Sequence, residues 1–168
     1  MNSLIRYEML KDQMKTGDLL QWQTNSLIGK GIQWFTKSPY SHSSLVIRLS
    51  EYEGLERRRF TTEAMAHGVV LNLLSKRLFY QKGHCWWFPL KDEWDCQREQ
   101  IGERALAFVG TPYDFKSIAR FVFGRVSEDV QSLFCSELAY IAYGYEGVPP
   151  SPAGILRLGI FKPGVAVV

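Results

Sequence analysis

Residues 42–65, HSSLVIRLSEYEGLERRRFTTEAM, contain two apolar segments separated by a charged stretch that includes one glycine. The segments 42–49 and 60–65 are rich in the β-branched and aromatic residues that favour strands. The charged residues between them indicate a solvated hairpin. Two strands joined in this way run antiparallel and lie side by side. This stretch therefore predicts an antiparallel β-sheet.

The segments on either side of this hairpin extend the pattern. Further strands are predicted at 17–22 (GDLLQW), 69–74 (VVLNLL) and 85–90 (CWWFPL). Helices are predicted at 25–36, 93–109, 114–123 and 133–144, with Ser132 as the N-cap of the last. Because strands come first and helices follow, the order indicates an α+β fold and not an alternating parallel sheet. The Gly and Pro content of residues 145–168 leaves the path of that segment open.

The length and charge of the chain limit what it can be. A chain of 168 residues, 46% hydrophobic and 22% charged, is typical of one globular domain over residues 1–168. Its net charge of +3 is too small to indicate a nucleic-acid partner. No secretory signal opens the chain, and no stretch approaches the length of a membrane span. We therefore expect a cytoplasmic protein without an integral membrane segment; delivery to the cell envelope and the oligomeric state stay open.

The cysteines indicate a reducing compartment and no zinc motif. Three of them, widely spaced, fit neither a disulfide framework nor a C-x-x-C site. A metal site could be built only from residues whose spacings match no helix or knuckle motif: His42, Glu63, His67 and His84. The chain also lacks the glycine-rich phosphate-binding motifs. The sequence therefore predicts neither a metal nor a cofactor.

Cys135 is the candidate nucleophile. With Ser132 as N-cap, Cys135 falls in the first turn of a helix, where unpaired N–H groups favour a thiolate. The same N–H groups could hold the oxyanion of a tetrahedral intermediate. The alternative is a small buried hydrophobic residue, which is how most unpaired cysteines behave.

His42 and Glu63 are the candidate base and its orienting acid. The hairpin sets His42, at the start of one strand, beside Glu63 or Met65 near the end of the next. Glu63 could then accept a hydrogen bond from the far ring nitrogen of His42 and fix its tautomer. The alternatives are a structural histidine and a solvent-facing glutamate.

Two short segments resemble a known family. Gly110–Tyr113 (GTPY) and Phe134–Leu138 (FCSEL) resemble the G-x-P-Y … D-C-S-G-L segments of the NlpC-type cell-wall cysteine peptidases. In those enzymes the Gly-Asp strand and the histidine strand follow the cysteine, whereas here they precede it. This order resembles the circularly permuted YiiX/YebB-like branch, with the lecithin retinol acyltransferases as more distant relatives. The resemblance covers roughly residues 16–140.

The resemblance implies a fold and a set of site residues. The fold would be papain-like and circularly permuted, with an antiparallel sheet packed against helices. Cys135 would be the nucleophile, His42 the base and Glu63 the third member, while Tyr113 would line the site and help to hold the oxyanion. Two positions depart from the family pattern: Phe134 replaces an aspartate and Glu137 replaces a glycine.

The expected function is that of a cysteine peptidase or amidase. It would cleave an amide bond, in a cell-wall-type peptide, through a thioester intermediate. Two alternatives stay open: a lipid or acyl-ester hydrolase or acyltransferase, and a non-catalytic binding module on the same scaffold. The partner is accordingly a peptide or an acyl substrate. Three aromatic residues are expected to line the groove: Trp34, Tyr40 and Trp87.

Overall fold

The computed structural model describes residues 3–25, 30, 33–34, 37–65, 67–111 and 130–168. Its strands are β1 Leu19–Thr24, β2 His42–Ile47, β3 Phe60–Met65, β4 Gly68–Leu73, β5 Gly83–Phe88 and β6 Val165–Ala166. Its helices are α1 Ser3–Leu10, α3 Leu74–Tyr80, α4 Arg98–Ala107, α6 Val130–Ala142 and α7 Pro152–Ile155. Two 3-10 turns cover Asp92–Gln97 and Leu156–Leu158. Within this part of the chain, no helix combines the length and the apolar character that crossing a membrane requires.

The strands form one six-stranded sheet in the order β4-β3-β2-β1-β5-β6, and every neighbouring pair is antiparallel. The expected hairpin joins β2 to β3, with Leu45 opposite Thr62 and Ile47 opposite Phe60. The predicted strand at 60–65 has the observed bounds of β3. β1 starts two residues later than expected, because Gly17 adopts a positive φ of 86° in the turn that precedes it. The α+β class follows directly from this arrangement.

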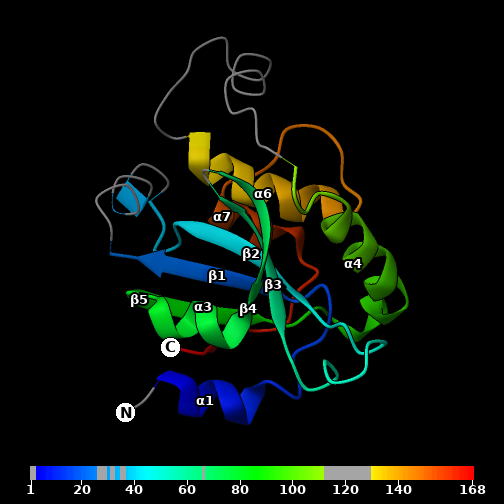
Figure 1. Cartoon of the computed structure of the whole chain (residues 1–168). Coiled ribbons are helices and arrows are strands. Elements are labelled where there is room, and N and C mark those ends of the chain that lie inside the picture. The colour runs from blue at the N-terminus through cyan, green and yellow to red at the C-terminus, as the bar shows by residue number, and fades with distance from the viewer. Residues whose placement is uncertain (1–2, 26–29, 31–32, 35–36, 66, 112–129) are drawn as a thin grey trace.

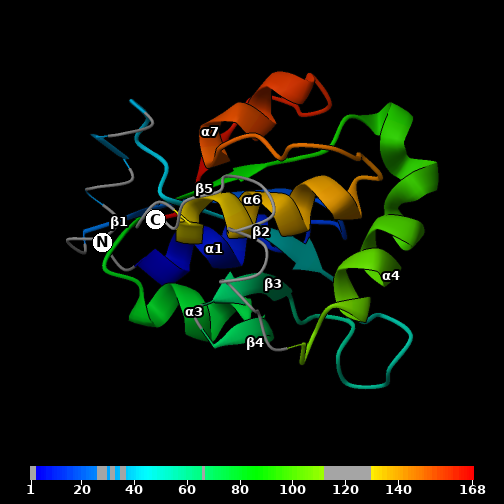
Figure 2. The same ribbon diagram turned by 90° about the horizontal axis from the view of Figure 1, so that it is seen from above.

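Alternate residues of the central strands face two separate cores. Leu19 and Leu45 face one core, which α4 and α6 complete. Their neighbours Leu20 and Val46 face the other core, which α1 and α3 complete. Figure 1 shows α6 and α7 on one side of the sheet and α1 and α3 on the other. Figure 2 looks down on the first side, where α6 lies between α7 and α4. Helices thus cover both faces of β1 and β2.

The helical predictions had mixed outcomes. The segment 93–109 is divided between a 3-10 turn and α4. The prediction of Ser132 as N-cap is wrong, because α6 already includes Val130 and the serine lies within it. A serine caps a helix only where the backbone leaves the helical conformation, and nothing in the sequence around it forces that exit. The predicted helix at 114–123 and most of that at 25–36 lie outside the described residues.

Candidate active site

His42 and Glu63 meet on the β2–β3 hairpin. The Nε2 atom of His42 lies 3.0 Å from Oε2 of Glu63. Continuing the register beyond the Leu45–Thr62 pair places Ser44 opposite Glu63. His42 precedes Ser44 by two residues, so it lies diagonally across from Glu63 on the same face of the sheet. The antiparallel register is therefore sufficient to bring this pair together.

Glu63 is a fully buried carboxylate with three hydrogen-bond donors around it. Its side chain is 0% exposed, and Nε of Arg77 lies 3.1 and 3.0 Å from its two oxygens. Nδ2 of Asn72 donates to Oε1 at 3.3 Å. Burial alone would raise the pKa of Glu63, but the hydrogen bonds and charges of His42 and Arg77 outweigh it, so the pKa is lowered. The carboxylate is consequently ionised at neutral pH.

Cys135 reaches the same histidine from α6, which packs on both strands of the hairpin. Burial lowers the pKa of His42, but the charge and hydrogen bond of Cys135, followed by those of Glu63, raise it to about 9. Because Glu63 occupies Nε2, Nδ1 is the ring nitrogen left to face the thiol. His42, which is 13% exposed, is therefore an imidazolium at neutral pH and bridges Cys135 and Glu63.

The expected place of Cys135 at a helix N-terminus is wrong. Cys135 is the sixth residue of α6, and only the first four N–H groups of a helix lack an intrahelical acceptor. The backbone N–H of Cys135 is thus committed within the helix and cannot hold an oxyanion. The other expected oxyanion donor, Tyr113, lies outside the described residues.

The aromatic residues near the sheet are arranged differently from the prediction. Trp87 is buried, and its Nε1 donates to Oδ2 of Asp18 at 2.8 Å, so it does not line a groove. Tyr40 instead packs edge-to-face against Trp86, with ring centroids 5.4 Å apart. Trp34 is strongly exposed. Trp87 was misassigned because neighbouring positions of β5 face opposite sides of the sheet.

Arg77 and Asn72 belong to the site and were missed in the sequence. Asn72 interrupts an otherwise apolar strand, and Arg77 is the last of three consecutive polar residues in a short helix. Each is a weak signal, because polar residues in strands and helices usually face solvent. Only the fold shows that both side chains turn toward the same buried carboxylate.

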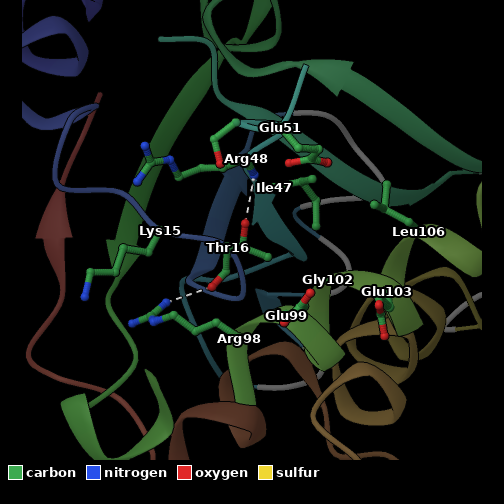
Figure 3. Close-up of a pocket in the computed structure, with 11 residues that line it drawn as sticks. Lys15, Thr16, Ile47, Arg48, Glu51, Arg98, Glu99, Gly102, Glu103 and Leu106 are labelled. Atoms are coloured by element: carbon green, nitrogen blue, oxygen red, sulfur yellow. Dashed lines mark hydrogen bonds between the residues drawn. The ribbon is translucent and has the colours of Figure 1, made fainter. Parts of the chain in front are cut away.

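A separate charged cavity lies at the other end of β2, beside α4 (Figure 3). Its volume is about 540 Å³, and none of His42, Glu63 and Cys135 lines it. Two of its cations already have partners: Lys15 pairs with Asp95 and Arg98 with Asp18. The reactive side chains are therefore gathered elsewhere, at the start of β2.

Comparisons with known proteins show a likeness of fold. No family model matches the chain, and no curated protein matches it. The crystal structure of the metalloprotein yiiX from Escherichia coli O157:H7 is similar, with a TM-score of 0.60. The sequences are 19% identical, and the match covers 91% of this chain and 97% of that one. At this level of identity the likeness is one of fold.

Proposed function

We propose that the protein is a cysteine hydrolase of the peptidase or amidase type. Cys135 is the nucleophile, His42 the general base and acid, and Glu63 the group that orients the imidazole. The observation that carries the proposal is the unbroken series of contacts from Cys135 through His42 to Glu63. A thiol, an imidazole and a carboxylate in this order make up a nucleophile with an oriented base.

The proposed reaction proceeds in two halves. The Cys135 proton resides on His42, and the thiolate attacks the carbonyl carbon of an amide. The C–N bond then breaks as His42 gives its proton to the leaving amine, and a thioester remains on the sulfur. In the second half His42 takes a proton from water, the resulting hydroxide attacks the thioester, and the carboxylic acid leaves. The C–S bond breaks, and the released thiolate beside the newly protonated His42 is the starting ion pair.

The fold agrees with the family that the sequence motifs suggest. The likeness to yiiX supports placing the chain among the circularly permuted relatives of the NlpC-type peptidases, with a papain-like scaffold. That placement favours an amide of a cell-wall-type peptide as the substrate. Acyl esters are the competing class, because a thiolate attacks both carbonyl types through the same tetrahedral intermediate.

A metal-dependent role, which the name of the yiiX protein raises, does not fit these residues. Among the residues that the structure describes, no three or more His, Cys, Asp or Glu side chains are grouped to hold an ion. At the candidate site, both oxygens of Glu63 face the guanidinium of Arg77, which takes the place a cation would need.

A binding module on the same scaffold is the second candidate function. The observation in its favour is the burial of Cys135, whose exposed fraction is 1%. A nucleophile must meet its substrate, so a permanently covered thiol would leave only a binding role. Reactivity of the thiol in solution decides between the two functions.

The test is alkylation by iodoacetamide at pH 5–9, with the modified cysteine located by peptide mass. We expect Cys135 to react faster than Cys85 and Cys96, to stay reactive below pH 7, and to lose that reactivity in His42→Ala. His84→Ala, which removes an exposed histidine, is the matched control and leaves the rate unchanged. An inert Cys135, or one indifferent to His42→Ala, would overturn the hydrolase proposal in favour of the binding module.

A reactive Cys135 leads to a substrate screen. Peptide amides and acyl esters are offered to the wild type and to Cys135→Ala, each with and without a chelator. We expect turnover of peptide amides that Cys135→Ala abolishes and that the chelator leaves intact. Loss of turnover with chelator would show a metal requirement and contradict the mechanism above.

A further inference from the structure

Arg77 contacts both oxygens of the Glu63 carboxylate, including the oxygen that contacts the histidine. It lies on α3, with a side chain only 18% exposed. Its Nε atom lies 3.0 Å from the same Oε2 oxygen that contacts His42, and 3.1 Å from Oε1. The carboxylate is therefore placed between an imidazole, which can gain or lose a proton, and a guanidinium, which stays charged.

The guanidinium is fixed by contacts other than Glu63. It stacks 4.5 Å from the ring centroid of Trp22, and its Nη1 atom donates to Oε1 of Gln81 at 2.5 Å. The Trp22 ring is itself held, because its Nε1 atom donates to the Ser44 hydroxyl at 2.8 Å. A guanidinium packed on a fixed ring loses little further freedom when it binds the carboxylate. These contacts thus hold the Arg77 guanidinium in place independently of Glu63.

Several helices and strands contribute the charged and titratable groups around Glu63. β2 contributes His42, β4 the neutral amide of Asn72 and α3 the guanidinium of Arg77. β5 contributes the buried thiol of Cys85, whose pKa is raised well above its usual value by burial, so it carries no charge. α6 contributes Cys135, which acts through His42. Within the described part of the chain, Arg77 is the permanent positive charge that faces this carboxylate.

This permanent charge matters when the histidine is neutral. Each time His42 gives up its proton, Glu63 would become an isolated buried anion, which is a costly state. Such a carboxylate would take a proton, and a protonated Glu63 could no longer accept from Nε2–H or stabilise the next imidazolium. Arg77 provides a compensating charge that does not depend on the state of the histidine.

We propose that Arg77 is a positioning residue that keeps Glu63 ionised and aimed at His42 through both protonation states of the imidazole. The proposal rests on the proposed function, because it assigns Arg77 a part in the same site. It extends the series of contacts to four side chains: Cys135, His42, Glu63 and Arg77.

The test follows the ionisation of Glu63 directly, by the carboxyl ¹³C signal in protein labelled at glutamate and assigned with Glu63→Gln. We expect Glu63 to stay ionised between pH 8 and pH 5 in the wild type. In Arg77→Met its titration should move up by about one pH unit or more, and Arg77→Lys should restore most of the difference. Lys76→Met, which removes an exposed cation from the same helix, is the matched control that leaves Glu63 unchanged.

A folded Arg77→Met protein whose Glu63 signal follows the wild-type curve overturns the proposal. If Arg77→Met does not fold, as judged by thermal unfolding, Arg77→Gln replaces it, since the amide is neutral but still donates a hydrogen bond. A wild-type-like Glu63 curve in Arg77→Gln overturns the proposal equally.

The alkylation rate of Cys135 separates this proposal from the proposed function. We expect Arg77→Met to move the acid limb of the rate profile upward by about one pH unit while keeping the alkaline plateau. A merely structural role would lower the rate at every pH. If Glu63 responds to Arg77→Met but wild-type Cys135 is inert, the hydrolase proposal fails and the role of Arg77 in holding Glu63 stands.

Discussion

At the scale of single residues, the charge of His42 depends on its two neighbours. Burial lowers the pKa of His42, but Cys135 and Glu63 outweigh this effect and raise that pKa to about 9. Cys135→Ser removes the larger of the two favourable influences, so the pKa of His42 should fall markedly. Glu63→Gln should lower it as well. Both shifts can be measured by ¹⁵N NMR titration of the imidazole, with the exposed His84 as internal control; an unchanged pKa in Cys135→Ser would show that the two side chains do not interact.

Single residues also show which parts of the site can be predicted from a sequence. His42 and Glu63 could be paired in advance because a short hairpin fixes which residues of its two strands are close. Arg77 could not, because an arginine in a short helix usually extends into solvent, and only the packing of α3 turns it inward. The position of Cys135 was misjudged because a serine within a helix and a serine at its N-cap look alike in a sequence.

At the scale of secondary-structure elements, Asp18, which directly precedes β1, links β5 to α4. Its carboxylate is buried and accepts from Nε1 of Trp87 at 2.8 Å, from the backbone N–H of Leu90 at 3.0 Å and from Nη1 of Arg98 at 2.8 Å. Asp18→Asn should destabilise the protein by about 3–5 kcal/mol, because it leaves the guanidinium without its buried anion.

Urea unfolding measures this loss, with Asp92→Asn as the matched control. Asp92 pairs with Lys162 at the surface, so the same substitution there should cost less than about 1 kcal/mol. Equal midpoints for the two variants would mean that Asp18 does not join these elements.

The approach of α4 to the turn before β1 depends on a glycine. A Cβ atom added at Gly102 would lie 2.7 Å from Cγ2 of Thr16. Gly102→Ala ordinarily favours a helix by about 1 kcal/mol, but here the clash should make it destabilising by about 1–3 kcal/mol.

Thr16→Ser is the suppressor that identifies this clash. It deletes Cγ2 and keeps the hydroxyl that accepts from the backbone N–H of Arg48 at 2.9 Å. The double variant should therefore recover most of the stability that Gly102→Ala loses, as read from a double-mutant cycle. Additive losses would place the strain elsewhere.

The elements themselves were largely predictable, and their ends were not. Apolar segments rich in β-branched and aromatic residues located the strands, and β3 has the predicted bounds. β1 and β5 are displaced by two residues from their predicted bounds. The turn at Gly17 and the first residue of β5, Gly83, both adopt positive φ values that composition alone does not place. The structure of segment 145–168 could not be predicted, because α7 and β6 are too short to show the periodic spacing of apolar residues that identifies a helix or a strand.

At the scale of the whole molecule, the sheet separates two cores, and the second core depends on segments that are distant in the sequence. Val167 belongs to the same buried cluster as Tyr7 of α1 and Leu78 of α3. The adjoining strand β6 pairs with β5, which holds Val167 against this core. The second core is thus closed only when the last strand has docked.

Val167→Ala tests this closure by removing two methyl groups from the second core. Because Val167 is 1% exposed, we expect a loss of about 1–2.5 kcal/mol in the free energy of unfolding, from lost burial and the cavity left behind. Val148→Ala makes the same change at a residue that is 72% exposed and should stay within about 0.5 kcal/mol of the wild type. Urea unfolding midpoints compare the two, and a Val167→Ala protein as stable as Val148→Ala would mean that β6 does not close this core in solution.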